Sequence, residues 1–330
     1  MKVMVIEQFG EPDVFTEKAV PRPELKSGHV LIEVQATSVN SVDVLIRRHG
    51  PPFLSPSFPA ILHSDVAGIV VEVASDVKGF KPGDLVYGCA GGLPGMAGAL
   101  GEFMLADALL IAHKPASLSM AEAAALPLVI LTAWEALRER VVAQSGQKIL
   151  VHGGAGGVGH IAVQLAKIAG AQVYATVSTK EKASIVKELG AIETIDYDSM
   201  PVIDYVNQYT GGQGFDIVFD SVGNENLLRS FEATKLNGNV VTTMSLGQFD
   251  MSIAHLRGLS LHVIFMLIPL LHNINRSHHG RVLSEAAKLV DEGKLRPLID
   301  PHRFTFNEVS DAHRLMESGK HIGKIVLTRE

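Results

Sequence analysis

Apolar and polar residues alternate differently in the first third of the chain and in its middle. Before about residue 120, short apolar runs such as Lys2–Glu7, Val30–Gln35 and Ile69–Val73 are separated by proline and glycine. Short strands bounded by such breakers are typical of a mainly β domain, in part barrel-like. Where this pattern ends, Ser119 and Glu122 have the spacing of a capping box and predict the start of a helix.

From about residue 129 to residue 263, strand-like runs alternate with helical patterns. This alternation predicts βαβ units and a parallel sheet covered on both faces. The predicted strands are Lys148–His152, Gln172–Val177, Glu193–Ile195, Asp216–Asp220, Asn239–Thr243 and Leu259–Ile264, and the predicted helices are Val158–Ala169, Lys180–Leu189, Val202–Tyr209 and Glu225–Thr234.

The last part of the chain returns to a mixed pattern. It predicts helices over Arg281–Glu292 and Asn307–Glu317 and a strand over Lys324–Thr328. We therefore expect this segment to complete the β domain, so that residues 1–125 and 268–330 form one domain and residues 126–267 form the other. A cleft between two domains is the usual place for a ligand, and we expect the active site there.

A glycine-rich turn carries the clearest chemistry. It follows the strand at Lys148–His152 and opens a helix, and within it Gly154, Gly156 and Gly159 satisfy the pattern G-x-G-x-x-G. One glycine allows the tight turn, one lets the backbone approach a pyrophosphate, and one lets the helix pack on the strand. The helix start also offers unpaired N–H groups to phosphate. The motif predicts a dinucleotide site; the alternative is a glycine-rich turn without a ligand.

The end of the next strand indicates which dinucleotide is bound. Chains that bind NAD place an Asp or Glu there, which binds the ribose 2′-hydroxyl. Here Val177 is followed by Ser-Thr-Lys-Glu-Lys, with no acid at the strand end. A 2′-phosphate requires hydroxyl donors and a cation. Ser178 and Lys182, with Lys180 in reserve, therefore predict NADPH; the alternative is an ordinary helix start with solvated charges.

The amino-acid composition indicates which kinds of binding partner and which cellular location the protein has. A net charge of −6 and a pI near 6.2 argue against nucleic acid and anionic membranes, because both require a basic face. The single cysteine, Cys89, excludes an intramolecular disulfide and suits a reducing, cytoplasmic location. The longest apolar run, Leu259–Leu271, contains His262 and Pro269 and is shorter than the ~20 residues of a membrane span.

Several motifs together resemble the zinc-independent quinone oxidoreductases, the zeta-crystallin-like family of the medium-chain dehydrogenase/reductase superfamily. They are Asn40–Asp43, Phe80–Val86, Gly154–Gly159, Asp220–Gly223 and Gly323–Leu327, in the order that the family has them. The resemblance covers nearly the whole chain. It implies an α/β fold in which a Rossmann doubly wound parallel sheet is inserted in a GroES-like, mainly β catalytic domain. It also implies NADPH as cofactor and a homodimer, with a tetramer as the alternative.

The resemblance also separates this chain from relatives that use zinc. A catalytic zinc site needs three protein ligands, typically Cys and His. Zinc alcohol dehydrogenases have a cysteine where this chain has Asn40, and their histidine ligand corresponds to Ser64. Their structural zinc lobe needs four cysteines, and this chain has one. We expect no bound metal. His63, one place from the ligand position, is expected to be a packed or surface residue rather than a stray ligand.

Without a metal, the acceptor itself must spread the negative charge that follows hydride transfer. Quinones and conjugated enones do so, whereas simple ketones do not. The resemblance places Asn40 beside the nicotinamide and the substrate oxygen, to which its amide N–H can donate. Asp43 is similar to a family acid near this site, or it holds the loop of Asn40. Tyr87 is predicted as a proton donor or as a wall of the pocket.

Other cofactor contacts are implied by the resemblance alone. Thr132 would lie near the nicotinamide. Tyr197 would lie near the adenosine phosphate, or be a partly buried aromatic at a strand end. Lys324 would reach the phosphates, or be an exposed lysine at a strand start. The remaining contacts are Gly157 and Val158 at the pyrophosphate, Val222 at the ribose, and Ser245, Phe265, Met266 and Leu267 around the nicotinamide.

The segment Gly88–Gly101 is unusually rich in glycine and predicts either a mobile apolar lip on the substrate cleft or a plain flexible loop. As a whole, the sequence predicts an NADPH-dependent reductase of quinones or related conjugated carbonyls. A reductase of enones, 2-alkenals or enoyl thioesters shares the hydride step and is the alternative. A non-catalytic NADPH-binding protein is the alternative from another class, and the presence of Asn40 argues against it.

Overall fold

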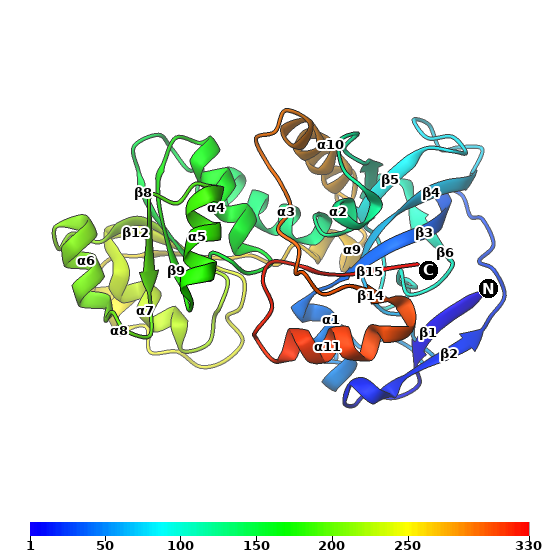
Figure 1. Cartoon of the computed structure of the whole chain (residues 1–330), viewed down its shortest axis with the longest axis horizontal. Coiled ribbons are helices and arrows are strands. Elements are labelled where there is room, and N and C mark those ends of the chain that lie inside the picture. The colour runs from blue at the N-terminus through cyan, green and yellow to red at the C-terminus, as the bar shows by residue number, and fades with distance from the viewer. Residues whose placement is uncertain (330) are drawn as a thin grey trace. The chain divides into compact units, whose positions relative to one another are not determined.

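A computed structural model describes residues 1–329 and divides the chain into two compact units (Figure 1). Unit 1 consists of Met1–Leu131 together with the chain from Leu267 onward, and unit 2 consists of Thr132–Met266. Unit 2 is thus one continuous segment that interrupts the sequence of unit 1. Each unit has its own β-sheet, and the two sheets differ in strand direction.

Unit 1 is built on a seven-stranded sheet around the long strand β3 (His29–Val39). The strand order is β14-β15-β3-β4-β5-β7, and β6 pairs with β3 beside this path. The pairs are antiparallel except β14 with β15. The other strands are β4 (Asp65–Val73), β5 (Leu85–Cys89), β6 (Phe103–Asp107), β7 (Ile111–His113), β14 (Phe304–Thr305) and β15 (Ile325–Thr328), while β1 (Lys2–Ile6) and β2 (Phe15–Ala19) form a separate antiparallel pair.

Short helices join these strands. The helix α2 (Met120–Ala124) begins at Ser119, and Glu122 closes the capping box, as the sequence predicts. The last part of the chain forms α10 (Ser277–Asp291) and α11 (Val309–Glu317), close to the predicted positions of these two helices. Other helices of unit 1 are η1 (Pro12–Val14), η2 (Ala108–Leu110), α9 (Ile268–His272) and η4 (Phe306–Glu308).

A helix that the sequence analysis did not predict follows β3. This helix, α1 (Ser41–His49), has Asn40 as its N-cap and Asp43 at its third position, so these two residues form a capping box. It ends at Gly50, whose φ of +46° lies in the left-handed region that favours glycine. The spacing Asn-x-x-Asp was therefore a local signal for a helix start.

Unit 2 contains a six-stranded sheet in which every pair is parallel. The strand order β10-β9-β8-β11-β12-β13 is the doubly wound Rossmann order and confirms the predicted fold. The strands are β8 (Lys148–His152), β9 (Gln172–Val177), β10 (Glu193–Asp196), β11 (Phe215–Asp220), β12 (Thr234–Thr242) and β13 (Ser260–Val263). The helices are α4 (Gly159–Ile168), α5 (Lys180–Leu189), α6 (Val202–Thr210), α7 (Asn226–Ala233) and α8 (Ser252–Leu256), and η3 (Glu135–Arg140) continues α3 (Pro127–Trp134).

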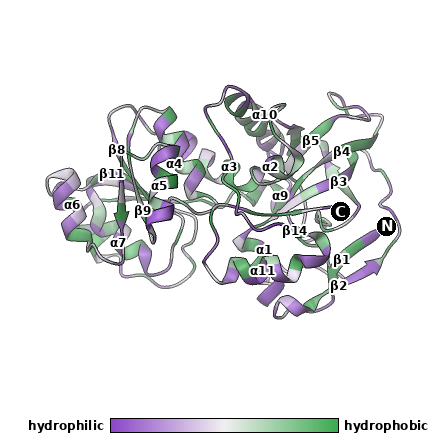
Figure 2. Ribbon diagram, in the orientation of Figure 1, coloured by the Kyte–Doolittle hydropathy of each residue, from purple (hydrophilic) through white to green (hydrophobic). Residues whose placement is uncertain are grey.

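Both faces of this sheet are covered because side chains alternate along each strand. Tyr174 of β9 packs with Tyr205 of α6 on one face. The next residue, Ala175, points to the other face, where it lies near Val186 of α5. Figure 2 shows apolar residues along the strands and hydrophilic residues distributed over the helices, the pattern of a sheet buried between helical layers.

One strand differs from its prediction. The strand β12 begins at Thr234 rather than at Asn239, and α7 accordingly ends at Ala233. Thr234 pairs with Phe215 of β11, and a register shift separates this pair from the regular pairing that follows. Such an irregularity lets the strand start early, before the apolar residues by which the sequence identified it.

Candidate active site

Apart from Thr132, which lies on α3, the predicted cofactor residues of unit 2 share one topological position, because they follow the carboxyl ends of parallel strands. Because the strands are parallel and adjacent, these ends lie along one edge of the sheet, with β8 and β11 at the point where the strand order reverses. The residues that follow the strand ends are Gly153–Gly159 after β8, Ser178 after β9, Tyr197 after β10, Val222 after β11, Ser245 after β12 and Phe265 after β13.

The glycine turn after β8 is sterically closed to side chains. Gly153 has a φ of +69°, in the region that favours glycine. A Cβ at Gly159 would lie 2.0 Å from the carbonyl oxygen of Gly153, and a Cβ at Gly154 would lie 2.7 Å from Cβ of Ala175. A Cβ at Gly156 would be less crowded, with its nearest neighbour at 3.1 Å. Glycine at Gly154 and Gly159 therefore lets α4 begin directly against the sheet.

The backbone of this turn fits a pyrophosphate. The N–H groups of Gly157 and Val158 have no acceptor within residues 1–329, and the helix α4 begins directly after them. Unpaired N–H groups at a helix start are the donors that bind phosphate oxygens. The donor set thus suits the diphosphate of a dinucleotide without any side chain.

The segment after β9 is open to a further anion. Thr179, not Ser178, caps α5, because its Oγ1 accepts from the backbone N–H of Lys182 at 3.2 Å. The ammonium groups of Lys180 and Lys182 have no ion pair among the described residues. Ser178 and Lys182 are therefore free to receive a 2′-phosphate, as the NADPH prediction requires.

Asp220, the last residue of β11, organises the turn that carries Val222. Its buried Oδ1 accepts from the backbone N–H groups of Val222 and Gly223, both at 2.9 Å. Ser221 Oγ then donates to the carbonyl oxygen of His152 at 2.9 Å, which joins the ends of β11 and β8. The motif Asp-Ser-Val-Gly thus sets the shape of this edge, and Asp220 acts through the turn.

Sequence reasoning missed two residues beneath the glycine turn. Thr176 Oγ1 accepts from the backbone N–H of Gly153 at 3.0 Å and lies 3.3 Å from Nδ1 of His152. Burial lowers the pKa of His152 to about 4, so the imidazole is neutral near pH 7. A polar residue near the end of each of two buried strands was the signal that could have identified the pair.

In unit 1, Asn40 lies in a buried polar cluster. Its backbone N–H donates to Oδ2 of Asp43 at 2.8 Å. Burial raises the pKa of Asp43 to about 7. This hydrogen bond agrees with the prediction that Asp43 holds the loop of Asn40. The other prediction, that Asp43 takes part in catalysis, stays a prediction.

The side chain of Asn40 is held from both ends. Lys324 Nζ donates to Asn40 Oδ1, and it also donates to the carbonyl oxygen of Val39 at 2.9 Å. Asn40 Nδ2 donates to Oδ2 of Asp65 at 2.8 Å. Lys324 is 1% exposed, so the alternative of an exposed lysine at a strand start is wrong, whereas its contact with the phosphates stays a prediction. Its ammonium is occupied inside unit 1.

Asp65, which the sequence analysis did not identify, is the centre of this cluster. It is fully buried and accepts from Ser38 Oγ and from the backbone N–H of Leu128, both at 2.8 Å. Leu128 stands near the start of α3, the helix that also carries the buried Thr132. Asp65 therefore fixes Asn40 and the start of α3 at the same time.

Tyr87 and His63 are both packed residues. The hydroxyl of Tyr87 is buried and donates to the carbonyl oxygen of Leu283 at 2.7 Å, and burial raises the pKa of this phenol. The predicted role of Tyr87 as proton donor is therefore wrong. His63 lies with its Nε2 3.0 Å from Nε2 of His313, and burial lowers its pKa to about 3. Its prediction as a packed residue is confirmed, and a surface position is wrong.

The segment Gly88–Gly101 is packed against β-domain backbone, which contradicts the prediction of a flexible loop. Backbone N–H groups of Ala90 and Ala99 donate to the carbonyl oxygens of Ser64 and His63, at 2.8 and 3.0 Å. A Cβ at Gly98 would lie 1.9 Å from the carbonyl oxygen of Leu62. The glycines allow close backbone approach rather than mobility. Cys89 is buried here and burial raises its pKa, so the thiol is inert.

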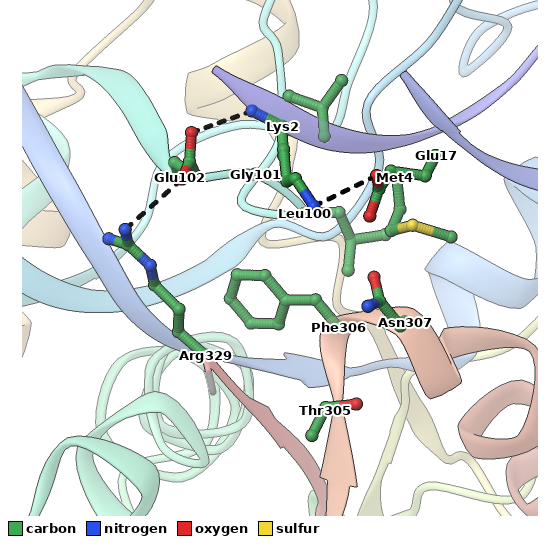
Figure 3. Close-up of a pocket in the computed structure, with 11 residues that line it drawn as sticks. Lys2, Met4, Glu17, Leu100, Gly101, Glu102, Thr305, Phe306, Asn307 and Arg329 are labelled. Carbon is green, nitrogen blue, oxygen red and sulfur yellow. Dashed lines mark hydrogen bonds and ion pairs between the residues drawn. The ribbon is translucent and has the colours of Figure 1, made fainter. Parts of the chain in front are cut away.

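A cavity of about 260 Å³ lies in unit 1, and none of the predicted catalytic or cofactor residues lines it (Figure 3). Lys2, Glu17, Glu102 and Arg329 contribute its charged groups. Glu102 accepts from the backbone N–H of Lys2 at 2.8 Å and from Arg329 at 3.4 Å. The ammonium of Lys2 lies 3.4 Å from Oε1 of Glu17, so each charged lining residue has a partner of opposite sign.

Within residues 1–329, no three or more His, Cys, Asp or Glu side chains are grouped so that they could hold a metal ion. No helix in the same range is long and apolar enough to cross a membrane.

Both units contain residues that match known protein families. The family described as alcohol dehydrogenase GroES-like domain matches residues 26–116, and the family described as zinc-binding dehydrogenase matches residues 189–327. The chain is 36% identical over 334 residues to the 2-methylene-furan-3-one reductase of Solanum lycopersicum, covering 99% of this chain and 79% of that protein. It is 34% identical, with the same coverage, to the chloroplastic NADPH-dependent alkenal/one oxidoreductase of Arabidopsis thaliana.

Solved structures agree. The Escherichia coli quinone oxidoreductase in complex with NADPH has a TM-score of 0.90 and 26% identity, over 99% of this chain and 100% of that one. The predicted combination of a GroES-like domain with a Rossmann domain is confirmed.

Proposed function

This chain belongs to the medium-chain dehydrogenase/reductase superfamily, and we propose that it is an NADPH-dependent reductase of quinones and related conjugated carbonyls. The observation that carries the proposal is Asn40, a buried amide donor whose orientation is fixed, at the position where zinc-dependent relatives have a metal ligand. Relatives named for quinones, alkenals and a methylene-furanone support this acceptor class.

The cofactor is NADPH, which supplies a hydride when bound. In unit 2, the N–H groups of Gly157 and Val158 bind the diphosphate, while Ser178 and Lys182 bind the 2′-phosphate. The turn held by Asp220 places Val222 at the same sheet edge. These residues bind and orient the cofactor, because none of them is placed to move a proton.

Asn40 acts on the acceptor. After an enone gains a hydride at its β-carbon, its former C=C electron pair becomes charge on the carbonyl oxygen. An N–H of Asn40 donates to that oxygen and stabilises the charge. A proton from water then completes the reduction, and a quinone takes up the same hydride and proton to give a hydroquinone. No metal is needed for this sequence.

One assay tests the proposal. NADPH oxidation is followed with 1,4-benzoquinone, a 2-alkenal and crotonyl-CoA in parallel, each with and without a chelator. We expect turnover of the quinone or the alkenal that the chelator does not change. Turnover confined to crotonyl-CoA would assign an enoyl-thioester reductase, and loss on chelation would overturn the metal-free mechanism. Tight NADPH binding without any turnover would assign a non-catalytic binding protein.

The protein is further proposed to be a cytoplasmic homodimer. The strand β13 ends its sheet with one neighbour, and Val263 on it is 51% exposed, so a second copy can pair there. Light scattering during gel filtration checks the assembly, and a monomer at all concentrations would contradict it. Cell fractionation checks the location, which the single buried cysteine favours.

A further inference from the structure

We infer that Lys324 is a positioning residue that fixes and polarises the amide of Asn40, with Asp65 holding both groups. The inference rests on the proposed reductase function, because it assigns the part that Lys324 plays in charge stabilisation at the acceptor. None of the three residues is a neighbour of another in sequence: Lys324 lies 284 residues from Asn40 and 259 from Asp65.

The hydrogen-bond partners leave Asn40 one orientation. A lysine ammonium only donates and an aspartate carboxylate only accepts. Because Lys324 Nζ contacts Oδ1 and Asp65 Oδ2 contacts Nδ2, exchanging the two ends of the amide would place donor against donor and acceptor against acceptor. The orientation is therefore fixed by charge and does not depend on the substrate.

This orientation turns the N–H side of the amide toward the acceptor. The amide nitrogen carries two hydrogens, and it donates to Asp65 Oδ2 at 2.8 Å. The side chain of Asp43 is also hydrogen-bonded to Asn40, so the acceptor oxygen competes with these two carboxyl groups for the amide hydrogens. Asn40 is 4% exposed, so the amide meets its ligand with little competition from water. If Lys324 were absent, the amide could rotate and present its oxygen to the developing negative charge.

Stability alone does not account for this lysine. Lys324 is fully buried, and burying an ammonium costs more free energy than an ion pair commonly returns. Its separation from Asp65 Oδ2 is 3.5 Å, which is long for an ion pair, whereas its bonds to Asn40 and Val39 are closer. An apolar side chain in its place would leave the buried Asp65 carboxylate without a cation, so Lys324 balances that charge. Its closer bonds direct the ammonium to the amide oxygen of Asn40.

A cation on the amide oxygen strengthens the opposite N–H as a donor. Hydrogen bonds that involve an ion are roughly twice as strong as neutral ones, and linked bonds polarise one another. When the reduced nicotinamide is oxidised and the acceptor gains the hydride, the electron pair displaced from its π bond collects on oxygen. Lys324 acts on that oxygen through Asn40, and the proton that completes the reduction comes from water.

The first experiment is a double-mutant cycle with Lys324→Met, Asn40→Ala and the pair, measured with a 2-alkenal. We expect Lys324→Met to lower kcat about 100-fold, as removal of a charge-stabilising donor does, with the Kd for NADPH changed less than twofold. In the Asn40→Ala background the same change should have almost no further effect. Lys324→Arg should recover part of kcat, and Lys320→Met, at an exposed lysine, is the matched control.

A second readout does not need turnover. The side-chain amide of Asn40, assigned by NMR as the signal lost in Asn40→Ala, should move in Lys324→Met and not in Lys320→Met. An unmoved amide signal would overturn the inference even in an active enzyme, and so would equal losses of kcat in both backgrounds. A moved signal in a protein that reduces no acceptor would instead overturn the proposed function and keep the positioning of Asn40. If Lys324→Met does not fold, Lys324→Arg serves in both measurements.

Discussion

The sheet edge of unit 2 and the polar cluster of unit 1 bind by opposite means. At the sheet edge, the donors are backbone N–H groups of Gly157 and Val158, available because no side chain fills the turn. In the cluster, the donor is the side-chain amide of Asn40, which is held between the buried Lys324 ammonium and the buried Asp65 carboxylate. Binding at the sheet edge depends on space that no side chain fills, whereas the cluster depends on the balance of its charges. Substitutions in the two regions should therefore act by different means.

The largest effect should come from unbalancing the cluster. Asp65→Asn leaves the buried ammonium of Lys324 without its carboxylate and turns an amide donor toward other donors. Removing one partner of a buried pair costs about 3–5 kcal/mol. Urea unfolding measures the change, and the surface variant Asp13→Asn should change stability little. If Asp65→Asn left the free energy of unfolding unchanged, the cluster would depend on shape, as the sheet edge does, and not on the balance of charges.

The pH dependence of stability sharpens the same point. Asp43 has its pKa raised from 3.8 to about 7 in the folded protein, so the folded state binds the extra proton. Its contribution is present below about pH 4 and is lost as the pH rises to about 7, by up to about 4 kcal/mol at about 1.4 kcal/mol per pKa unit. Asp43→Asn should remove this loss.

The difference between wild type and Asp43→Asn, measured by unfolding at several pH values, isolates Asp43. This matters because His63, whose pKa is lowered to about 3, titrates in the opposite sense and costs stability as the pH falls below 6.5. Parallel curves for the two proteins between pH 4 and 7 would show that Asp43 is not held in the protonated form.

The sheet edge should break by crowding. Gly159→Ala places a Cβ 2.0 Å from a backbone oxygen, which must move and displace the start of α4. We expect NADPH affinity to fall about 100-fold, or about 2.7 kcal/mol, in a fluorescence titration. Gly156→Ala meets its nearest atom at 3.1 Å and should keep the fold while weakening binding less. If both substitutions lowered NADPH affinity equally, steric crowding of the added Cβ would not be the cause.

The smallest effect concerns the one side-chain contribution at that edge. Lys182→Met should lower NADPH affinity about 10-fold, since it removes a cation opposite the 2′-phosphate, and leave NADH affinity unchanged. The ratio of the two Kd values is the measurement, with Lys187→Met at the other end of α5 as control. A wild-type enzyme that uses NADH as well as NADPH would contradict the assignment of Ser178 and Lys182.

The sequence predicted local features well and contacts between distant residues poorly. The strand β9 and the helix α5 were predicted with their observed bounds, because alternation and breakers are local. The residues after each parallel strand were likewise predicted, since topology brings strand ends together. Lys324 was misjudged because lysine is almost never fully buried and its partners lie far away in sequence. Tyr87 failed for the same reason, as its acceptor is 196 residues away.

The insertion of unit 2 within unit 1 sets an order of folding. As the chain is synthesised, Asn40 and Asp65 emerge first, then the whole continuous segment Thr132–Met266, and only then Lys324. Contacts across 284 residues form slowly, because a large loop must close, whereas unit 2 can fold as soon as it emerges. Lys324 reaches the Asp65 carboxylate only when β15 pairs with β3. The nucleotide-binding unit therefore completes its fold before the unit that holds Asn40.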